Sequence, residues 1–325
     1  MLLQQLLSVR NCPFAWVQLD ERIQRLLQLP NGVSAVYVRP SLWSRLLAEW
    51  RLWREVQSGD MVLCFHGLPP LFPLRGSVVV FLQNRLLVEP GSLASYSLRF
   101  RVRIGMERFL SRVLQVRVSR YIVQTQSMAA SVQRWLRHEV PVSVLPFSQS
   151  VQPEDALPHA ALERGFDFVY VSSGEPHKNH RNLLEAWRLL MEAGHRPSLA
   201  LTLDDEVDAE LSAYIKQYAA EFDLDVVNLG ILSRVDVVAL YRSARAMIYP
   251  STTESLGLPL IEASRHQLPI LAPELDYVRD VVEPAETFDP ASPTSIARAV
   301  KRFLGAGELP AVIGTAEEFL AKVCR

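Results

Sequence analysis

Short apolar runs alternate with segments of helical spacing through the first part of the chain. Ser41, a good N-cap residue, precedes a helical pattern formed by Leu42, Leu46, Trp50 and Trp53. Strands that alternate with helices favour a parallel, doubly wound α/β sheet. The strand-like runs cover residues 14–19, 33–38, 61–65, 78–82, 121–124 and 142–145.

The alternation lapses between 145 and 165, where Pro146, Pro153 and Pro158 lie among polar and small residues. We place a domain linker there, between domains at 1–150 and 160–325. The second domain is also predicted to be doubly wound, and its last helix is a candidate to pack back on the first domain. Its predicted strands are 166–171, 199–203, 226–229, 246–249 and 269–271, and its helices are 182–193, 207–220, 235–241, 259–265, 294–304 and 315–323.

Length and composition agree with a two-domain globular protein. A chain of 325 residues exceeds one hydrophobic core, and its 49% hydrophobic and 21% charged content is ordinary. No apolar run approaches the roughly 18 residues that span a bilayer, and the N-terminus does not resemble a signal peptide. The isolated Cys12, Cys64 and Cys324 encode neither a disulfide framework nor a zinc site, so we expect a cytoplasmic protein.

The net charge of −1 conceals a division along the chain. Residues 1–150 carry 18 Arg, no Lys and 8 acidic residues, a net charge of +10, whereas the remainder has a net charge of −11. Such asymmetry predicts that the first half binds an anionic surface or substrate.

Candidate chemistry lies in loops that follow predicted strands, where open α/β sheets bind their ligands. The stretch 249–263 combines Glu254, Gly257 and Glu262 at a helix start marked by Pro259. Lys178 similarly precedes a predicted helix. Helix N-termini bind anions, so the two loops together predict a site for a phosphorylated, hydroxyl-rich ligand. Lys178 before a helix, or a pair of carboxylates such as Glu254 and Glu262, is by itself more often a solvated surface pattern. Only their occurrence together indicates a binding site.

These residues carry a resemblance to the family 4 glycosyltransferases. Residues 250–263 look like the E-x7-E motif of that family, with Glu254 and Glu262 as its carboxylates. Residues 171–186 resemble its "E-P-x-K-N…L-L-x-A" segment, and residues 229–244 resemble its "G…L-Y-x-x-A" run. The resemblance is strong over about residues 166–290 and only topological over 1–150.

The resemblance implies two Rossmann-like domains facing a cleft, the GT-B fold, with retention of anomeric configuration. Lys178 would neutralise the diphosphate leaving group, Glu254 would accept hydrogen bonds from the donor sugar, and Glu262 would hold the ribose diol. No metal and no cofactor beyond the nucleotide-sugar substrate are expected. The implied donor-binding residues are Gly174, Lys178, Asn179, Gly230, Ile231, Ser255, Leu256, Gly257, Leu258 and Glu262.

Three departures from the family pattern stand out. His177 occupies a position where many relatives have a second phosphate-binding Arg, a role that Arg181 or a first-domain arginine would then fill. Gln83 lies where many relatives place a catalytic His. The nearest imidazole is that of His66, although a single His after a strand more often has a structural role. The expected first strand and glycine-rich loop are missing, which suggests that roughly 15–20 residues precede this start.

Arginines and apolar residues interleave between Arg99 and Arg120. One interpretation is a helix on an anionic membrane surface, and the other is a domain helix whose apolar stripe is core. Nucleic-acid binding is disfavoured because no recognition module is visible. The D-x-D triplet at Asp223 and Asp225 is interpreted as a turn, not as a metal site.

The sequence therefore predicts a transferase, cytoplasmic and peripheral on the inner face of the membrane. It would move a sugar from a UDP- or GDP-sugar to a lipid-linked or polysaccharide acceptor in surface polysaccharide or lipopolysaccharide biosynthesis. Two alternatives remain open: a sugar-nucleotide epimerase of similar architecture, and a catalytically silent sugar-nucleotide-binding subunit or truncated homologue. A dinucleotide oxidoreductase is disfavoured because no G-x-G-x-x-G follows a strand.

Overall fold

A computed structural model describes residues 2–9, 12–24, 27–89, 91, 93–147, 165–307 and 315–316. The central part of the predicted linker and nearly all of the predicted helix at 315–323 lie outside the described residues. The domain boundaries and the packing of the last helix therefore stay predictions.

Among its described residues, the first half has six parallel strands, in two sheets of order β1-β2 and β3-β4-β5-β6. Each lies within about two residues of a strand-like run in the sequence. The strands are β1 (Trp16–Asp20), β2 (Ser34–Val38), β3 (Met61–Cys64), β4 (Ser77–Phe81), β5 (Arg120–Val123) and β6 (Val142–Val144). The helices are α1 (Leu2–Leu7), α2 (Leu42–Glu55), α3 (Leu98–Leu114) and α4 (Gln126–Trp135), with 3-10 turns η1 (Glu21–Ile23), η2 (Arg85–Leu87) and η3 (Gln115–Arg117).

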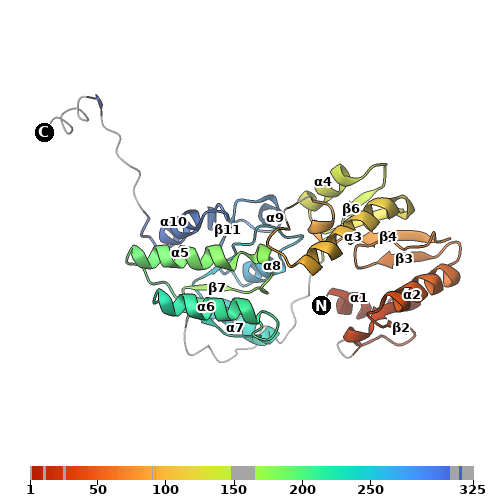
Figure 1. The fold of residues 1–325 in the computed structure, drawn as a ribbon, viewed down its shortest axis with the longest axis horizontal. Helices are drawn as coiled ribbons and strands as arrows, with labels where there is room; N and C mark the ends of the chain where they lie inside the picture. The colour runs from red at the N-terminus through yellow and green to blue at the C-terminus, as the bar shows by residue number, and fades with distance from the viewer. Residues whose placement is uncertain are drawn as a thin grey trace.

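The second half forms one six-stranded parallel sheet of order β12-β11-β10-β7-β8-β9. Its central strands are fully buried, as helices on both faces require (Figure 1). The strands are β7 (Phe168–Tyr170), β8 (Leu199–Leu201), β9 (Val226–Asn228), β10 (Ala246–Ile248), β11 (Ile270–Pro273) and β12 (Glu286–Phe288). The helices are η5 (Pro176–Lys178), α5 (His180–Glu192), α6 (Ala209–Glu221), α7 (Arg234–Ser243), α8 (Leu258–Arg265), α9 (Asp276–Arg279) and α10 (Pro293–Phe303).

The predicted α/β class with parallel sheets is confirmed. In the second half, β7 comes first in the chain and lies centrally, between β8 and β10. In the described part of the first half, β1 pairs only with β2, and β3 pairs only with β4.

The interpretation of the apolar stripe of helix α3 as part of the core is wrong. Leu98, Val102 and Phe109 are 70%, 60% and 66% exposed, whereas Ile104 and Leu114 are buried. The apolar stripe of the sequence therefore faces outward, and a smaller set of side chains attaches the helix to the first half.

The two halves touch beside the carboxyl ends of the second sheet. Helix α4 contacts α9 (Figure 1), and the backbone N–H of Ser127 donates to Asp280 Oδ2 at 2.9 Å. The loops that follow β7 and β10 thus lie against the first half.

Gly257, the N-cap of α8, has φ +71, and a Cβ there would lie 3.0 Å from Leu260 Cδ1. We expect Gly257→Ala to lower the free energy of unfolding by about 1–2 kcal/mol, because an L-residue is strained in the left-handed region. Urea unfolding would measure it. Gly105, exposed in α3 with nothing within 4 Å of a built Cβ, is the control. Gly105→Ala should be neutral or stabilising, and an equal loss in both variants would contradict the argument.

Candidate active site

The loops after β7 and β10 bring Lys178 and Glu254 together. These strands are neighbours in the sheet, with Phe168 opposite Ala246, so their loops leave the same edge side by side. Lys178 Nζ lies 2.6 Å from Glu254 Oε1. The two side chains are only 12% and 13% exposed, so the ion pair is largely shielded from water.

Glu254 Oε1 has two further donors. The hydroxyl of Ser251 donates at 2.8 Å and that of Tyr249 at 2.9 Å. Burial, and then the nearby carboxylate, hold the pKa of Tyr249 well above its usual range, so this hydroxyl stays protonated as a donor. Charge-assisted hydrogen bonds of this kind offset the cost of removing a carboxylate from water.

Asn179 ties this edge of the sheet together. It adopts a left-handed conformation with φ 64, which ends η5 and starts α5. Its side-chain amide donates to the carbonyl oxygens of Pro250 at 3.2 Å and Pro290 at 2.7 Å. Asn179, a predicted donor-binding residue, therefore links three loops in this structure.

Helix α5 begins at His180, two residues before the predicted start. The His180 ring is 4% exposed, packs on Tyr170 with centroids 4.9 Å apart, and has Nε2 3.2 Å from the Ser172 hydroxyl. Burial, which penalises the charged imidazolium, lowers the pKa of His180 to about 3. A neutral aromatic ring thus lies directly behind the Lys178 loop.

The remaining predicted donor residues occupy the same edge. Gly174 donates its N–H to Asp208 Oδ2 at 3.0 Å, and any side chain at 174 would collide with that carboxylate. Gly230, with φ 73, follows β9 and precedes Ile231, which is 74% exposed. Glu262 lies on α8 near the Tyr241 hydroxyl, whose pKa is raised first by burial and then by that carboxylate. Ser255, Leu256, Gly257 and Leu258 form the turn into α8, whose first N–H groups lack intrahelical acceptors.

Gln83 and His66 are not brought to the ion pair by any described contact. The Gln83 side-chain amide donates to the Phe65 carbonyl oxygen at 2.9 Å, and His66 is exposed on the loop after β3. Their catalytic roles stay predictions.

Arg85 is the first-half arginine that reaches the site. Its guanidinium donates to the Glu254 carbonyl oxygen at 3.2 Å and lies 2.8 Å from Glu89. Arg181, the alternative candidate, lies over the Tyr214 ring at 4.1 Å from its centroid. Arginine-rich composition indicated such a residue, but not its position.

His177, at the position of the expected second Arg, contacts the first half. Its Nδ1 lies 2.9 Å from the Tyr96 hydroxyl, and its Nε2 lies 4.0 Å from Glu254 Oε1. Burial is the main cause that lowers the pKa of His177. At neutral pH the His177 ring is therefore uncharged and does not replace the missing cation.

A cleft of about 1180 Å³ runs between the two halves beside these loops. Its second-half wall includes His177, Asn179 and Thr252, and its first-half wall includes Arg85 and Tyr96. Among the residues that the structure describes, no three His, Cys, Asp or Glu side chains gather as metal ligands would.

The family model of the group 1 glycosyl transferases matches residues 152–318, just over half of the chain. The chain belongs to the group 1 glycosyl transferases. The matched segment contains both loops that carry Lys178 and Glu254, so the resemblance noted in the sequence is confirmed at the level of the family.

Curated relatives and solved structures extend this similarity. The chain is 27% identical over 146 residues to serotype-specific mannosyltransferase WbdA of Escherichia coli, covering 45% of this chain and 18% of that protein. It is 33% identical over 119 residues to an E. coli O-antigen chain mannosyltransferase B, covering 35% of this chain and 30% of that protein. The chain thus spans less than a third of these relatives.

Two solved structures illustrate the similarity of fold. WaaG, a glycosyltransferase involved in lipopolysaccharide biosynthesis, has a TM-score of 0.61 at 16% identity, covering 86% of this chain and 79% of WaaG. Anabaena HepE in complex with UDP and glucose has a TM-score of 0.61 at 14% identity, covering 84% of this chain and 77% of HepE. The predicted GT-B architecture is confirmed.

The buried His180 makes stability depend on pH. The unfolded chain takes up a proton near pH 6.5, whereas the folded protein does so only near pH 3, so stability is lost as pH falls between these values. We expect His180→Phe to remove this contribution. The stability advantage of the wild type over the variant should shrink by up to about 1.4 kcal/mol per pH unit. Urea unfolding at pH 7, 6 and 5 would measure it, and parallel pH profiles of the two proteins would contradict it.

Proposed function

We propose that this protein transfers a hexosyl group from a UDP- or GDP-sugar to a lipid-linked or polysaccharide acceptor, in surface polysaccharide or lipopolysaccharide biosynthesis. The observation that carries the proposal is the shielded Lys178–Glu254 pair, on two adjacent loops of the segment that matches the group 1 family. The names of the E. coli relatives support mannose as the first sugar to test in the nucleotide-sugar donor.

Donor binding would separate this ion pair. The donor diphosphate would take the ammonium of Lys178, helped by the N–H groups at the start of α5. Glu254 would then accept hydrogen bonds from sugar hydroxyls while it keeps those from Ser251 and Tyr249. Glu262 would hold the ribose diol, since a carboxylate has two acceptor oxygens, and Ile231 offers apolar area to the base.

Charge stabilisation at the leaving group would promote transfer, and attack from the face that the leaving group occupied would retain the anomeric configuration. The bond between the anomeric carbon and the phosphate oxygen breaks, its electron pair stays with the nucleoside diphosphate, and Lys178 stabilises that charge. The acceptor hydroxyl attacks from the same face, and its proton passes to the departing phosphate oxygen. This scheme assigns no step to a metal, because Lys178 and helix N–H groups supply the positive charge.

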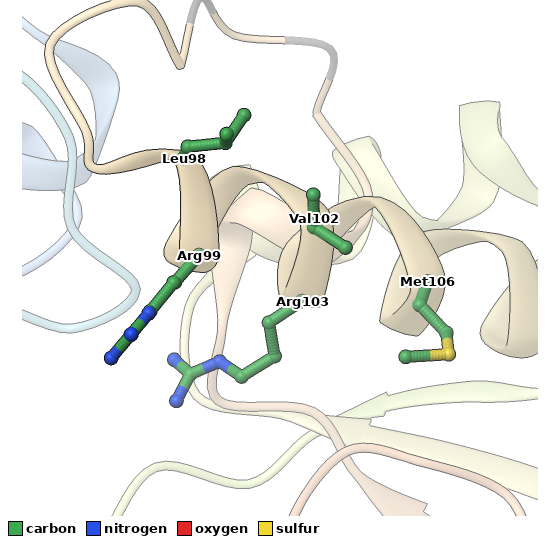
Figure 2. Close-up of a pocket in the computed structure, with 5 residues that line it drawn as sticks. All are labelled: Leu98, Arg99, Val102, Arg103 and Met106. Atoms are coloured by element: carbon green, nitrogen blue, oxygen red, sulfur yellow. The ribbon is translucent and has the colours of Figure 1, made fainter.

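The outward face of α3 supports attachment to an anionic membrane. Figure 2 shows Leu98, Val102 and Met106 beside Arg99 and Arg103 on this helix. Apolar side chains flanked by arginines suit the boundary between headgroups and acyl chains of anionic lipids. In the part of the chain that the structure describes, no helix is long and apolar enough to cross a membrane. We propose a peripheral position on the cytoplasmic face, where nucleotide sugars would be available.

Replacing Glu254 tests the proposed chemistry. Glu254→Gln keeps size but removes the negative charge, and we expect transfer from the preferred nucleotide sugar to fall at least about 100-fold. Nucleotide binding, followed as thermal stabilisation in a panel that includes GDP-mannose, should survive. Glu192→Gln is the control, because Glu192 is exposed at the end of α5. Full activity in Glu254→Gln would overturn the assignment, and a wild type that binds nucleotide without transfer would indicate a silent subunit.

Charge removal on α3 tests membrane attachment. We expect Arg99, Arg101 and Arg103, changed together to Gln, to weaken flotation with anionic liposomes and to leave the low binding to neutral liposomes unchanged. The matched control changes Arg75, Arg120 and Arg137, which are exposed elsewhere in the first half, to Gln. Equal flotation of both triple variants would remove α3 as the attachment site.

A further inference from the structure

The first-half wall of the cleft is basic. Arg108 and Arg112 from α3, Arg134 from α4 and Arg85 from η2 all line it. None of these residues belongs to the motifs that define the donor site. A wall that gathers four guanidinium groups favours an anionic ligand.

Hydrogen bonds to the backbone hold two of these arginines in place. Arg108 donates to the carbonyl oxygens of Leu86 at 2.6 Å and Glu89 at 2.9 Å. Arg112 donates to the carbonyl oxygen of Trp135 and lies 5.5 Å from the centroid of its ring. A guanidinium has five N–H donors, so each retains donors after these bonds. Side chains that are already held in place lose less conformational entropy when they bind a ligand.

One carboxylate, that of Glu89, also lines the cleft, and its own hydrogen-bonding partners largely offset its negative charge. Its Oε1 lies 2.8 Å from Arg85 Nε and accepts a hydrogen bond from the hydroxyl of Ser131. In the described part of the chain, Arg108, Arg112 and Arg134 form no ion pair with a carboxylate, so this wall carries an excess of positive charge.

Apolar groups lie next to the arginines. Phe109 and Trp135 line the same cleft, together with Leu86 and Val88. A bare phosphate would leave this apolar area exposed to water, whereas a phosphate attached to a lipid or a sugar ring would cover it. The ligand is therefore expected to be an amphiphilic phosphate.

We propose that the first-half wall binds a phosphate or diphosphate group of the acceptor through Arg108, Arg112 and Arg134. This proposal rests on the proposed function, because it makes the ligand the acceptor of that transfer. The cleft continues from these arginines to His177, Asn179 and Thr252 on the donor side. An acceptor anchored by its phosphate would thus extend a hydroxyl toward the loop of Glu254.

Calorimetric titration of the full chain tests this site. The probes are farnesyl diphosphate and glucose 6-phosphate, each compared with farnesol or glucose, which lack the phosphate. We expect the wild type to bind at least one phosphorylated probe and to bind its unphosphorylated partner more weakly. Which probe binds distinguishes a lipid phosphate from a sugar phosphate. Binding of neither phosphorylated probe would overturn the proposal.

Variants place the binding within the cleft. Arg134→Gln should lower the affinity for the phosphorylated probe about 10- to 100-fold, the range for loss of a charged hydrogen bond. Arg112→Gln should have a similar effect, whereas Arg75→Gln, on an exposed loop outside the cleft, should have none. Equal affinities in all three variants would overturn the site.

Lys178→Gln separates this proposal from the proposed function. It should weaken nucleotide binding while the phosphorylated probe still binds, because Lys178 does not line the basic wall. Loss of probe binding in Lys178→Gln would place the probe in the donor site and refute the second anion site. If the wild type binds the probe through Arg134 but neither binds nor uses any nucleotide sugar, the proposed function fails while the anion site stands.

Discussion

The contact between Lys178 and Glu254 holds together the loops after β7 and β10 at the carboxyl edge of the second sheet. A shielded ion pair is favourable only when its members keep good partners, because both charges have lost water. Glu254 achieves this with the hydroxyls of Ser251 and Tyr249. Those hydroxyls in turn require the loop after β10 to fold back over the strand end. A ligand that withdraws Lys178 would leave Glu254 with two neutral donors and capacity for sugar hydroxyls.

The first half also stabilises this loop. Arg85 donates to the Glu254 carbonyl oxygen at 3.2 Å, and the Thr125 hydroxyl donates to that of Ser255 at 3.3 Å. The Tyr96 hydroxyl meets His177 on the neighbouring loop. The position of the Glu254 loop therefore depends on the relative position of the two halves. Movement of one half against the other would change the donor site as well as the width of the cleft.

Much of the fold could be predicted from the sequence, because apolar periodicity is a local property. The strands and the positions of Lys178 and Glu254 followed from short motifs and from the parallel sheet. Arg85 could not be assigned, since its partner Glu254 lies 169 residues further along the chain. For α3 the sequence left two interpretations open, a membrane-surface helix and a helix whose apolar stripe is core, and could not decide between them. Periodicity identified an apolar stripe there, but packing decides whether such a stripe meets protein, as Ile104 does, or solvent, as Leu98 does.

The proposed donor site in the second half and the proposed anion-binding surfaces of the first half suggest what the division of charge between the halves does. The proposed anionic donor would bind in a half whose net charge is −11, so its attraction would come from groups at short range, namely Lys178 and helix N–H groups. The first half, with a net charge of +10, attracts anions over longer distances, and salt weakens that attraction strongly. Capture of an anionic acceptor or membrane should therefore be the salt-sensitive event. Donor recognition depends on local geometry, because a shielded ammonium group is screened much less by salt.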